Sequence, residues 1–334
     1  MTWLITGGAG YIGAHVVRAM TGAGERAVVL DNLSTGVAER VPEDVPLIVG
    51  STLDRGLLDR TISEHEVTGV VHLAAKKQVA ESVELPLLYY RENVQGLRTL
   101  LEAVVAGGVG RFVFSSSAAV YGMPDADLVA GTGLVTEDMP CAPMSPYGET
   151  KLAGEWLTRA AGRAHGISTA CLRYFNVAGA ASPELADTGV FNIVPMVFEK
   201  LTEGAAPLIF GADYDTPDGT CVRDYIHVED LADAHLAAAR KLGERGPVRD
   251  LTLNIGRGEG VSVREMIDLI AEVTGYRDRP AEITARRPGD PARVVAAADR
   301  ITAELGWKAR HDVRDMIASA WAGWLLHHPE ARRA

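Results

Sequence analysis

The chain is poor in cysteine, and this shortage excludes two kinds of protein. Its 334 residues include only three cysteines, Cys141, Cys171 and Cys221. They are odd in number and widely spaced, so they form neither a disulfide framework nor a zinc-binding pattern. We therefore expect reduced thiols, a cytoplasmic protein and no bound metal.

The chain also lacks positive charge and long apolar runs. Its 33 Lys and Arg residues stand against 44 Asp and Glu residues, a net charge of −11. Such a balance argues against a nucleic-acid partner or a membrane-surface role. No apolar run reaches the roughly 18 residues of a membrane span, and no signal segment is recognisable at the start. A chain of this length can bury a full core.

Up to about residue 175, β-rich runs alternate with longer amphipathic runs. This alternation predicts βαβ units, hence an α/β fold with a Rossmann-like, doubly wound parallel sheet. We expect strands over residues 3–5, 27–30, 47–49, 69–73, 111–115 and 168–172.

Beyond residue 175 the pattern loosens, although helices are clear over residues 263–274 and 311–327. We expect residues 1–175 to form one domain and residues 176–334 a smaller, mixed α/β domain, parts of which return to pack on the first. A ligand would lie between them, at the carboxyl ends of the strands.

A glycine loop follows the first expected strand. Gly7, Gly10 and Gly13 stand in a GxxGxxG spacing before a helical pattern, and Asp31 ends the second expected strand 18 residues after Gly13. Such a loop brings backbone N–H groups close to a pyrophosphate, while the acid binds the adenosine ribose and disfavours the extra phosphate of NADP. The pattern predicts NAD binding; the alternative is a tight turn, with Asp31 capping a loop beside Asn32.

A second motif can carry acid–base chemistry. Ser145 is expected to cap a helix that starts at Pro146, which places Tyr147 and Lys151 on one face. A lysine ammonium near a phenol lowers the phenol pKa from ~10, so that Tyr147 could take a proton from a substrate hydroxyl. Ser117, at the end of another expected strand, could bind the same hydroxyl. The alternatives are a surface Tyr/Lys pair and serines that only cap a loop, the interpretation we favour for Ser115 and Ser116.

With these motifs in place, the chain resembles the extended short-chain dehydrogenase/reductase family, and within it the epimerases that interconvert UDP-glucose and UDP-galactose. The resemblance runs almost from end to end. The matching segments are TGGAGYIG (6–13), LDNLSTG (30–36), HLAAKKQVAESV (72–83), FSSSAAVYG (114–122), SPYGETK (145–151), LRYFNVAGA (172–180), DGTCVRDYIHVEDLADAH (218–235) and RRPGD (286–290).

The resemblance implies roles for individual residues. Tyr147 is the expected base, Lys151 its partner and the holder of the nicotinamide ribose, and Ser117 the third catalytic residue. The expected NAD contacts are Gly7, Gly10, Tyr11, Ile12, Gly13, Asp31, Asn32, Ser34, Thr35, Gly36, Ser51, Thr52, Leu73, Ala74, Ala75, Lys77, Asn93, Ser115, Tyr147, Lys151 and Phe175. The expected UDP-sugar contacts are Lys77, Ser117, Tyr147, Asn176, Asn192, Arg223, Arg287, Asp290 and Val294.

The guanidinium groups of Arg223 and Arg287 suit a diphosphate, the alternative being surface ion pairs. The implied reaction is a transient oxidation at carbon 4 by bound NAD, followed by rotation of the 4-keto sugar and reduction on its other face. Residues 94–106 and 147–163 are implied to pair between two copies, giving a homodimer.

Other chemistries of the fold are less favoured. Related dehydratases and decarboxylases carry an acid where this chain has Ala118 and Ala119, which cannot move protons. Two alternatives stay open: a 4-epimerase of another nucleotide sugar, such as a UDP-pentose or UDP-uronate, and a non-catalytic NAD-sensing regulator. An intact Ser117, Tyr147 and Lys151 set argues against the regulator.

Two positions depart from the family pattern. Ser51 stands where an aspartate commonly meets the adenine, which predicts weaker NAD retention. Val294 stands where a tyrosine restricts the sugar site, and its smaller side chain predicts that N-acetylated UDP-sugars are also accepted.

Overall fold

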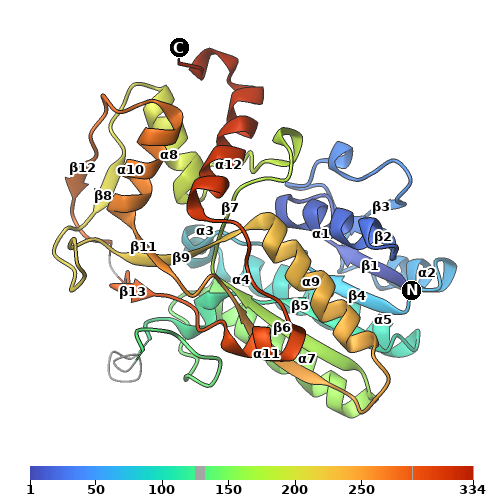
Figure 1. The fold of residues 1–334 in the computed structure, drawn as a ribbon. Helices are drawn as coiled ribbons and strands as arrows, with labels where there is room; N and C mark the ends of the chain where they lie inside the picture. Colours follow the sequence, from blue (N-terminus) through green and yellow to red (C-terminus); the bar gives the residue numbers. More distant parts are fainter. Residues whose placement is uncertain (125–131, 288, 334) are drawn as a thin grey trace.

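A seven-stranded parallel sheet organises the computed structural model, which describes residues 1–124, 132–287 and 289–333 (Figure 1). The strand order is β10-β6-β5-β4-β1-β2-β3, and each neighbouring pair is parallel. This confirms the expected Rossmann-like α/β fold, and the six expected strands are all present. The strands are β1 (Thr2–Thr6), β2 (Arg26–Asp31), β3 (Leu47–Val49), β4 (Gly69–His72), β5 (Arg111–Ser115), β6 (Ser168–Tyr174) and β10 (Asp250–Ile255).

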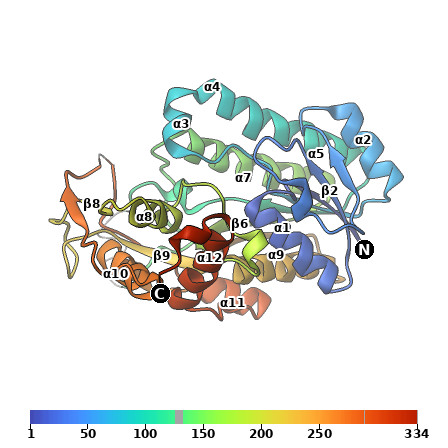
Figure 2. The same ribbon diagram turned by 90° about the horizontal axis from the view of Figure 1, so that it is seen from above.

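Helices cover both faces of this sheet (Figure 2). One apolar core joins the sheet to α1 (Tyr11–Gly22), α9 (Val228–Gly243) and α11 (Asp299–Leu305). A second core on the opposite face joins it to α2 (Arg55–Glu64), α5 (Gly96–Ala106) and α7 (Pro146–His165). Because the central strands are buried on both faces, they read as continuous apolar runs rather than as alternating ones.

The C-terminal part is smaller and less regular. Its helices are α8 (Ile193–Thr202), α10 (Val263–Thr274) and α12 (Val313–His327), which share a third core. Its short strands are β7 (Asn176–Ala178), β8 (Leu208–Phe210), β9 (Val222–His227), β11 (Gly260–Ser262), β12 (Glu282–Thr284) and β13 (Arg293–Val294). The expected helix from residue 311 begins two residues later, because Asp312 forms a capping box with Asp315.

Three elements beyond residue 175 lie with the first sheet. Strand β10 pairs with β6, helix α9 packs against α1, and α11 shares their apolar core. We keep the division at residue 175 as a proposal, with α9, β10 and α11 counted as returning segments.

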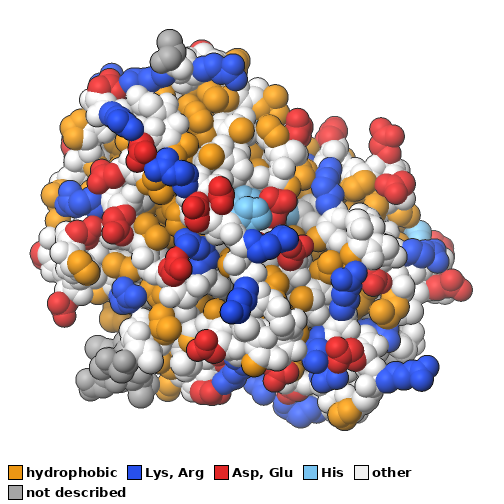
Figure 3. Space-filling view, in the orientation of Figure 1, with side chains coloured by type: hydrophobic (Ala, Val, Ile, Leu, Met, Phe, Trp, Pro, Cys, Tyr) orange, Lys and Arg blue, Asp and Glu red, His pale blue; other side chains and the backbone are white. Residues whose placement is uncertain are grey.

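Shorter elements connect these parts. They are α3 (Val79–Glu84), α4 (Pro86–Tyr89), the π-helix η2 (Tyr90–Gln95) and the 3-10 turns η1 (Ala38–Arg40), η3 (Ala118–Tyr121), η4 (Pro183–Leu185) and η5 (Pro329–Ala331). Within the described ranges, no helix is long and apolar enough to cross a membrane. On the face in Figure 3, side chains of both charges are interspersed.

Candidate active site

The glycines of the loop between β1 and α1 let segments of the backbone pack closely against one another. Gly7 has φ +76°, and a Cβ there would lie 2.7 Å from the Ala74 nitrogen; a Cβ on Gly13 would lie 2.0 Å from the Gly7 oxygen. Gly10 caps α1 without a side-chain bond, so the N–H groups of the first helical turn are not capped by a side chain. Such a helix start is suited to hold a pyrophosphate.

Asp31 ends β2 beside this loop. Its carboxylate accepts hydrogen bonds from the backbone nitrogens of Ala9 (3.0 Å) and Leu33 (2.9 Å). Asp31 therefore does order the loop after β2, as the alternative interpretation held, but it also lines the cleft. Carboxylate oxygens have further acceptor capacity for ribose hydroxyls.

A cleft of about 330 Å³ extends from the glycine loop to helix α7. A glycine cradle, an uncapped helix start and an acid at the end of β2 lie along it, so its residues fit a dinucleotide. Most of the residues expected at NAD line it: Gly7, Gly10, Tyr11, Ile12, Gly13, Asp31, Asn32, Ser34, Thr35, Ser51, Thr52, Leu73, Ala74, Ala75, Lys77, Tyr147 and Lys151.

Four residues expected at NAD are not part of this lining. A Cβ on Gly36 would lie 2.7 Å from an Asp31 carboxylate oxygen, so this glycine permits a close approach. Phe175 packs in an apolar cluster with Val120. The other two, Asn93 and Ser115, are buried and bind protein groups.

Asn93 uses its whole amide to hold the wall of the cleft. Its oxygen accepts from the Lys76 nitrogen (2.8 Å), and its nitrogen donates to the Lys76 carbonyl and the Thr150 hydroxyl (both 3.0 Å). Asn93 thus fastens the segment after β4 to helix α7. We propose that it positions this wall rather than contacts NAD.

Ser115 and Ser116 are not loop caps, and that interpretation was wrong. Both are fully buried. The Ser115 hydroxyl pairs with Nε2 of His235 (2.8 Å), and the Ser116 hydroxyl donates to Glu155 (2.5 Å). Their partners lie on helices α9 and α7, far along the chain, and sequence patterns do not reveal such pairs.

Ser117, Tyr147 and Lys151 come together at the carboxyl ends of the strands. Ser145 accepts from the Gly148 nitrogen (3.2 Å) and Pro146 is the first helical residue, which confirms the expected start of α7. Tyr147 and Lys151 lie on the first two turns of this helix. Ser117 follows β5 and forms the N-cap of η3.

The electrostatics of this group differ from the expectation. Burial raises the pKa of Tyr147 above 10, and a hydrogen bond with Ser117 lowers it only in part. Burial lowers the pKa of Lys151 to about 8, opposed by the charge of Glu155. The Lys151 ammonium donates to the Ser115 carbonyl (2.8 Å). A net lowering of the Tyr147 pKa by Lys151 is thus not found.

A second pocket, of about 360 Å³, lies in the C-terminal part. It gathers five of the residues expected at the UDP-sugar: Asn176, Asn192, Arg223, Arg287 and Asp290. Arg223 pairs with Asp290 (3.4 Å), and the Arg287 guanidinium lies 3.7 Å from the centroid of the Phe210 ring. Pro288, within the matched RRPGD segment, lies outside the described residues.

Val294 lies outside the lining of both pockets but next to their residues. It is half-buried on β13, in register with Arg223 on β9, and packs on the cluster that contains Phe175. We keep its role at the sugar as a proposal.

Among the residues that line the cleft without having been expected there are two aromatic ones, Tyr174 and Phe191. Phe191 is 55% exposed and lines both pockets, which places it between them. Tyr174 lines the cleft, whereas its neighbour Phe175 packs in the apolar cluster. Tyr174 ends β6 and Phe175 follows it directly. Because successive side chains of an extended chain point to opposite sides, only one of the two faces the cleft.

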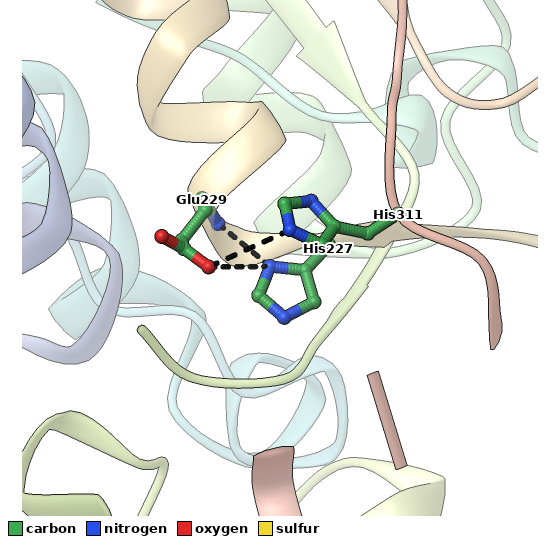
Figure 4. A group of neighbouring side chains, drawn as sticks. All are labelled: His227, Glu229 and His311. Atoms are coloured by element: carbon green, nitrogen blue, oxygen red, sulfur yellow. Dashed lines mark hydrogen bonds and ion pairs between the residues drawn. The ribbon is translucent and has the colours of Figure 1, made fainter. Parts of the chain in front are cut away.

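His227, Glu229 and His311 form a cluster near the start of α9 (Figure 4). The two imidazoles stack with centroids 4.2 Å apart and planes 26° apart. Lone pairs in nearly parallel rings do not converge on one ion, and Nδ1 of His227 already accepts from the Glu229 nitrogen (3.1 Å). The cluster therefore fits a helix cap better than a metal site.

Comparisons with known proteins agree with this geometry. The model of the NAD dependent epimerase/dehydratase family matches residues 3–256. A UDP-glucose 4-epimerase of Azospirillum brasilense is 46% identical over 96% of this chain and 91% of that protein.

Two solved structures are similar over nearly the whole chain. One is a UDP-glucose 4-epimerase from Stenotrophomonas maltophila with bound NAD and formylated UDP-arabinopyranose (TM-score 0.92, 37% identity, 99% of both chains). Another is the UDP-Glc/GlcNAc 4-epimerase of Campylobacter jejuni (TM-score 0.84, 35% identity, 97% of this chain and 99% of that chain).

Proposed function

The chain belongs to the NAD dependent epimerase/dehydratase family, and from that premise we propose that it interconverts UDP-glucose and UDP-galactose. It is an NAD-dependent epimerase. One observation carries the proposal: Tyr147, which bonds with Ser117, and Lys151 line the cleft that fits a dinucleotide, and Phe191 joins this cleft to a pocket with two arginines. A dinucleotide and a nucleotide sugar can thus approach one another.

Each part of the site has a task in this reaction. Tyr147 takes the proton of the 4-hydroxyl of the sugar and later returns it, and Ser117 binds the same oxygen. The glycine loop and Asp31 would hold NAD, which would supply a reversible acceptor for the hydride of carbon 4. Lys151 places an ammonium group 5.9 Å from the centroid of the Tyr147 ring.

The nucleotide anchors the sugar while its ring turns over. Arg223 and Arg287 bind the diphosphate, and Asn176, Asn192 and Asp290 bind the remaining polar groups. Because the anchor lies in the second pocket, the 4-keto sugar can rotate without leaving the cleft. Exclusion of water protects this keto sugar.

The substrate range follows from Val294. A small side chain there leaves room for the N-acetyl group of UDP-GlcNAc and UDP-GalNAc, and the relative from Campylobacter jejuni is named for both kinds of sugar. A panel of UDP-galactose, UDP-GalNAc, a UDP-pentose and a UDP-uronate, with products resolved by chromatography, tests the proposal. Turnover of only the pentose or the uronate would overturn it, and so would no turnover by folded protein.

We further propose a cytoplasmic homodimer. Cys141, Cys171 and Cys221 are all unpaired, as expected in a reducing compartment. Trp156 on α7 is 63% exposed, and Leu87 on the adjoining α4 is 83% exposed. A second copy that packs its own α5 and α7 against this face would bury these side chains.

A further inference from the structure

A buried hydrogen-bond network centred on Glu155 ties the end of β5 to helix α7. The Glu155 carboxylate accepts one bond from the Ser116 hydroxyl (2.5 Å) and two from the Arg173 guanidinium (2.8 and 2.6 Å). Glu155, Ser116 and Arg173 are 1%, 0% and 5% exposed. None of these three side chains belongs to the described residues that line the cleft.

The network lies directly behind the residues of the proposed reaction. Ser116 stands between Ser115, whose carbonyl accepts from Lys151, and Ser117. Glu155 lies one helical turn beyond Lys151 and two turns beyond Tyr147 on the same helix. One carboxylate thus joins the strand that presents Ser117 to the helix that presents the other two residues.

We infer that Glu155 is a positioning residue, which fixes Ser117, Tyr147 and Lys151 relative to one another by holding the end of β5 against α7. The inference rests on the proposed function for its kinetic consequences. Arg173 has the task of orienting the carboxylate: its two parallel bonds leave Glu155 one geometry, the one that reaches Ser116.

The network is anchored on its far side as well. Arg173 also donates to the Tyr121 hydroxyl (3.0 Å), which in turn donates to Asn254 on β10 (2.6 Å). Because each of these groups is buried and paired, a change at Glu155 leaves Arg173 with an uncompensated charge. A substitution of Glu155 should therefore disturb the network more than a substitution of one of its neutral members.

Glu155 also acts on Lys151 through its charge. Its negative charge raises the pKa of Lys151, against the lowering by burial. Neighbouring elements bring further titratable or charged groups near Lys151: His72 on β4, Tyr147 on α7, and Arg173 and Tyr174 on β6. Other charged residues line the same cleft, namely Lys76, Lys77, Glu81 and Glu92. Loss of the Glu155 charge lowers the Lys151 pKa, and the unpaired Arg173 acts in the same direction.

The test is Glu155→Gln, which keeps the shape of the side chain and removes its charge. We expect kcat on UDP-galactose to fall at least about tenfold with little change in KM, because misplaced groups slow the chemical step. We also expect the pH midpoint for acetylation of Lys151 by acetic anhydride, followed by peptide mass spectrometry, to move to lower pH. Arg159→Gln is the matched control, because Arg159 lies on the same helix as Glu155 and its ion pair with Asp250 on β10 is exposed. This change should alter neither quantity.

Ser116→Ala separates the two effects. It removes the bond between strand and helix but keeps the ion pair of Glu155 with Arg173, so kcat should fall while the Lys151 midpoint stays. Unchanged kcat in Ser116→Ala would overturn the inference even if Glu155→Gln does not fold. A folded Glu155→Gln with unchanged kcat and midpoint would also overturn it.

Acetylation needs no turnover, so the two proposals can fail separately. Suppose that the wild type does not turn over UDP-galactose but that Glu155→Gln still shifts the acetylation midpoint of Lys151. This result would support the inference and contradict the proposed function.

Discussion

Lys151 donates a hydrogen bond to the backbone carbonyl of Ser115 (2.8 Å), while its nitrogen lies 5.9 Å from the centroid of the Tyr147 ring. The lysine is thus held by the strand that leads to Ser117, at a fixed distance from the phenol ring. Burial raises the pKa of Tyr147. The base therefore depends on every positive charge that the site places near its oxygen.

Lys151→Met should lower kcat by about 10² or more, because it removes the fixed positive charge near the phenol. The measurement is turnover of UDP-galactose at saturating substrate and NAD. Lys308→Met, at an exposed position after α11, should leave kcat unchanged. Equal rates in the wild type and Lys151→Met would contradict the role of the ammonium.

Ser51→Asp should tighten NAD retention. Ser51 lines the cleft and its hydroxyl accepts from the Leu53 nitrogen (3.1 Å), a bond that a carboxylate can also accept. The added charge offers a stronger acceptor for the adenosine part of NAD. The fraction of protein that keeps NAD after gel filtration measures the effect.

Ser63→Asp is the control for this change, since it adds the same charge at an exposed position on α2. It should not alter retention. If Ser51→Asp retains no more NAD than the wild type does, the explanation for weak retention fails.

Val294→Tyr should abolish turnover of UDP-GalNAc and preserve that of UDP-galactose. The larger ring would fill space beside Arg223 and Phe175 that an N-acetyl group needs. Val294→Ala, which leaves this space open, should keep both activities. Parallel loss of both activities in Val294→Tyr would instead indicate a disturbed core.

Acidification below pH 6.5 should destabilise the fold. Burial lowers the pKa of His15, His227 and His235 to about 4 and that of His72 to about 3. Between pH 4 and the unfolded value of 6.5 the unfolded chain binds more protons at these sites. The free energy of unfolding therefore rises with pH across this window and falls on acidification.

Asp224 opposes this trend. Burial raises its pKa from 3.8 to about 6, so its contribution decreases as the pH rises between these values. Because one carboxyl group opposes four imidazoles, the free energy of unfolding still rises with pH. Urea denaturation at pH 5 and pH 7 measures the difference, and equal or greater stability at pH 5 would contradict it.

His235→Gln should reduce the slope of the free energy of unfolding against pH by up to about 1.4 kcal/mol per pH unit. His165→Gln, at the exposed end of α7, is the control and should leave the slope unchanged.

Trp156→Glu should convert the proposed dimer to a monomer. A charge in place of an exposed indole on α7 would have to be buried between two copies, which is costly without a partner. Sedimentation velocity measures the change. Leu326→Glu changes another exposed apolar residue, 51% exposed on α12, and should leave the mass unchanged. A wild-type protein that already sediments as a monomer would refute this interface.

The sheet could be predicted because its signals are local. Each of its first six strands is a short apolar run between loop residues, and glycines or a capping serine mark where helices follow. Helix α5 was harder, because the expected start at residue 94 falls inside the π-helix η2, which continues into α5. Periodicity alone does not distinguish these two kinds of helix.

The site residues also fall into those that the sequence predicts and those that it does not. Gly10, Asp31, Tyr147 and Lys151 lie in contiguous motifs, and the structure places all of them at the cleft. The positions of Asn93 and Ser115 could not be predicted. Their partners, among them Thr150 and His235, are brought to them only by the packing of distant helices.

The central claim is 4-epimerisation with bound NAD and Tyr147 as the base. Its most direct test is turnover of UDP-galactose by the wild type and by Tyr147→Phe, first without and then with added NAD. We predict that the wild type forms UDP-glucose, and that Tyr147→Phe is slower by about 10² or more at equal NAD content. No UDP-glucose from folded wild-type protein under either condition, or a Tyr147→Phe rate equal to that of the wild type, would contradict the account.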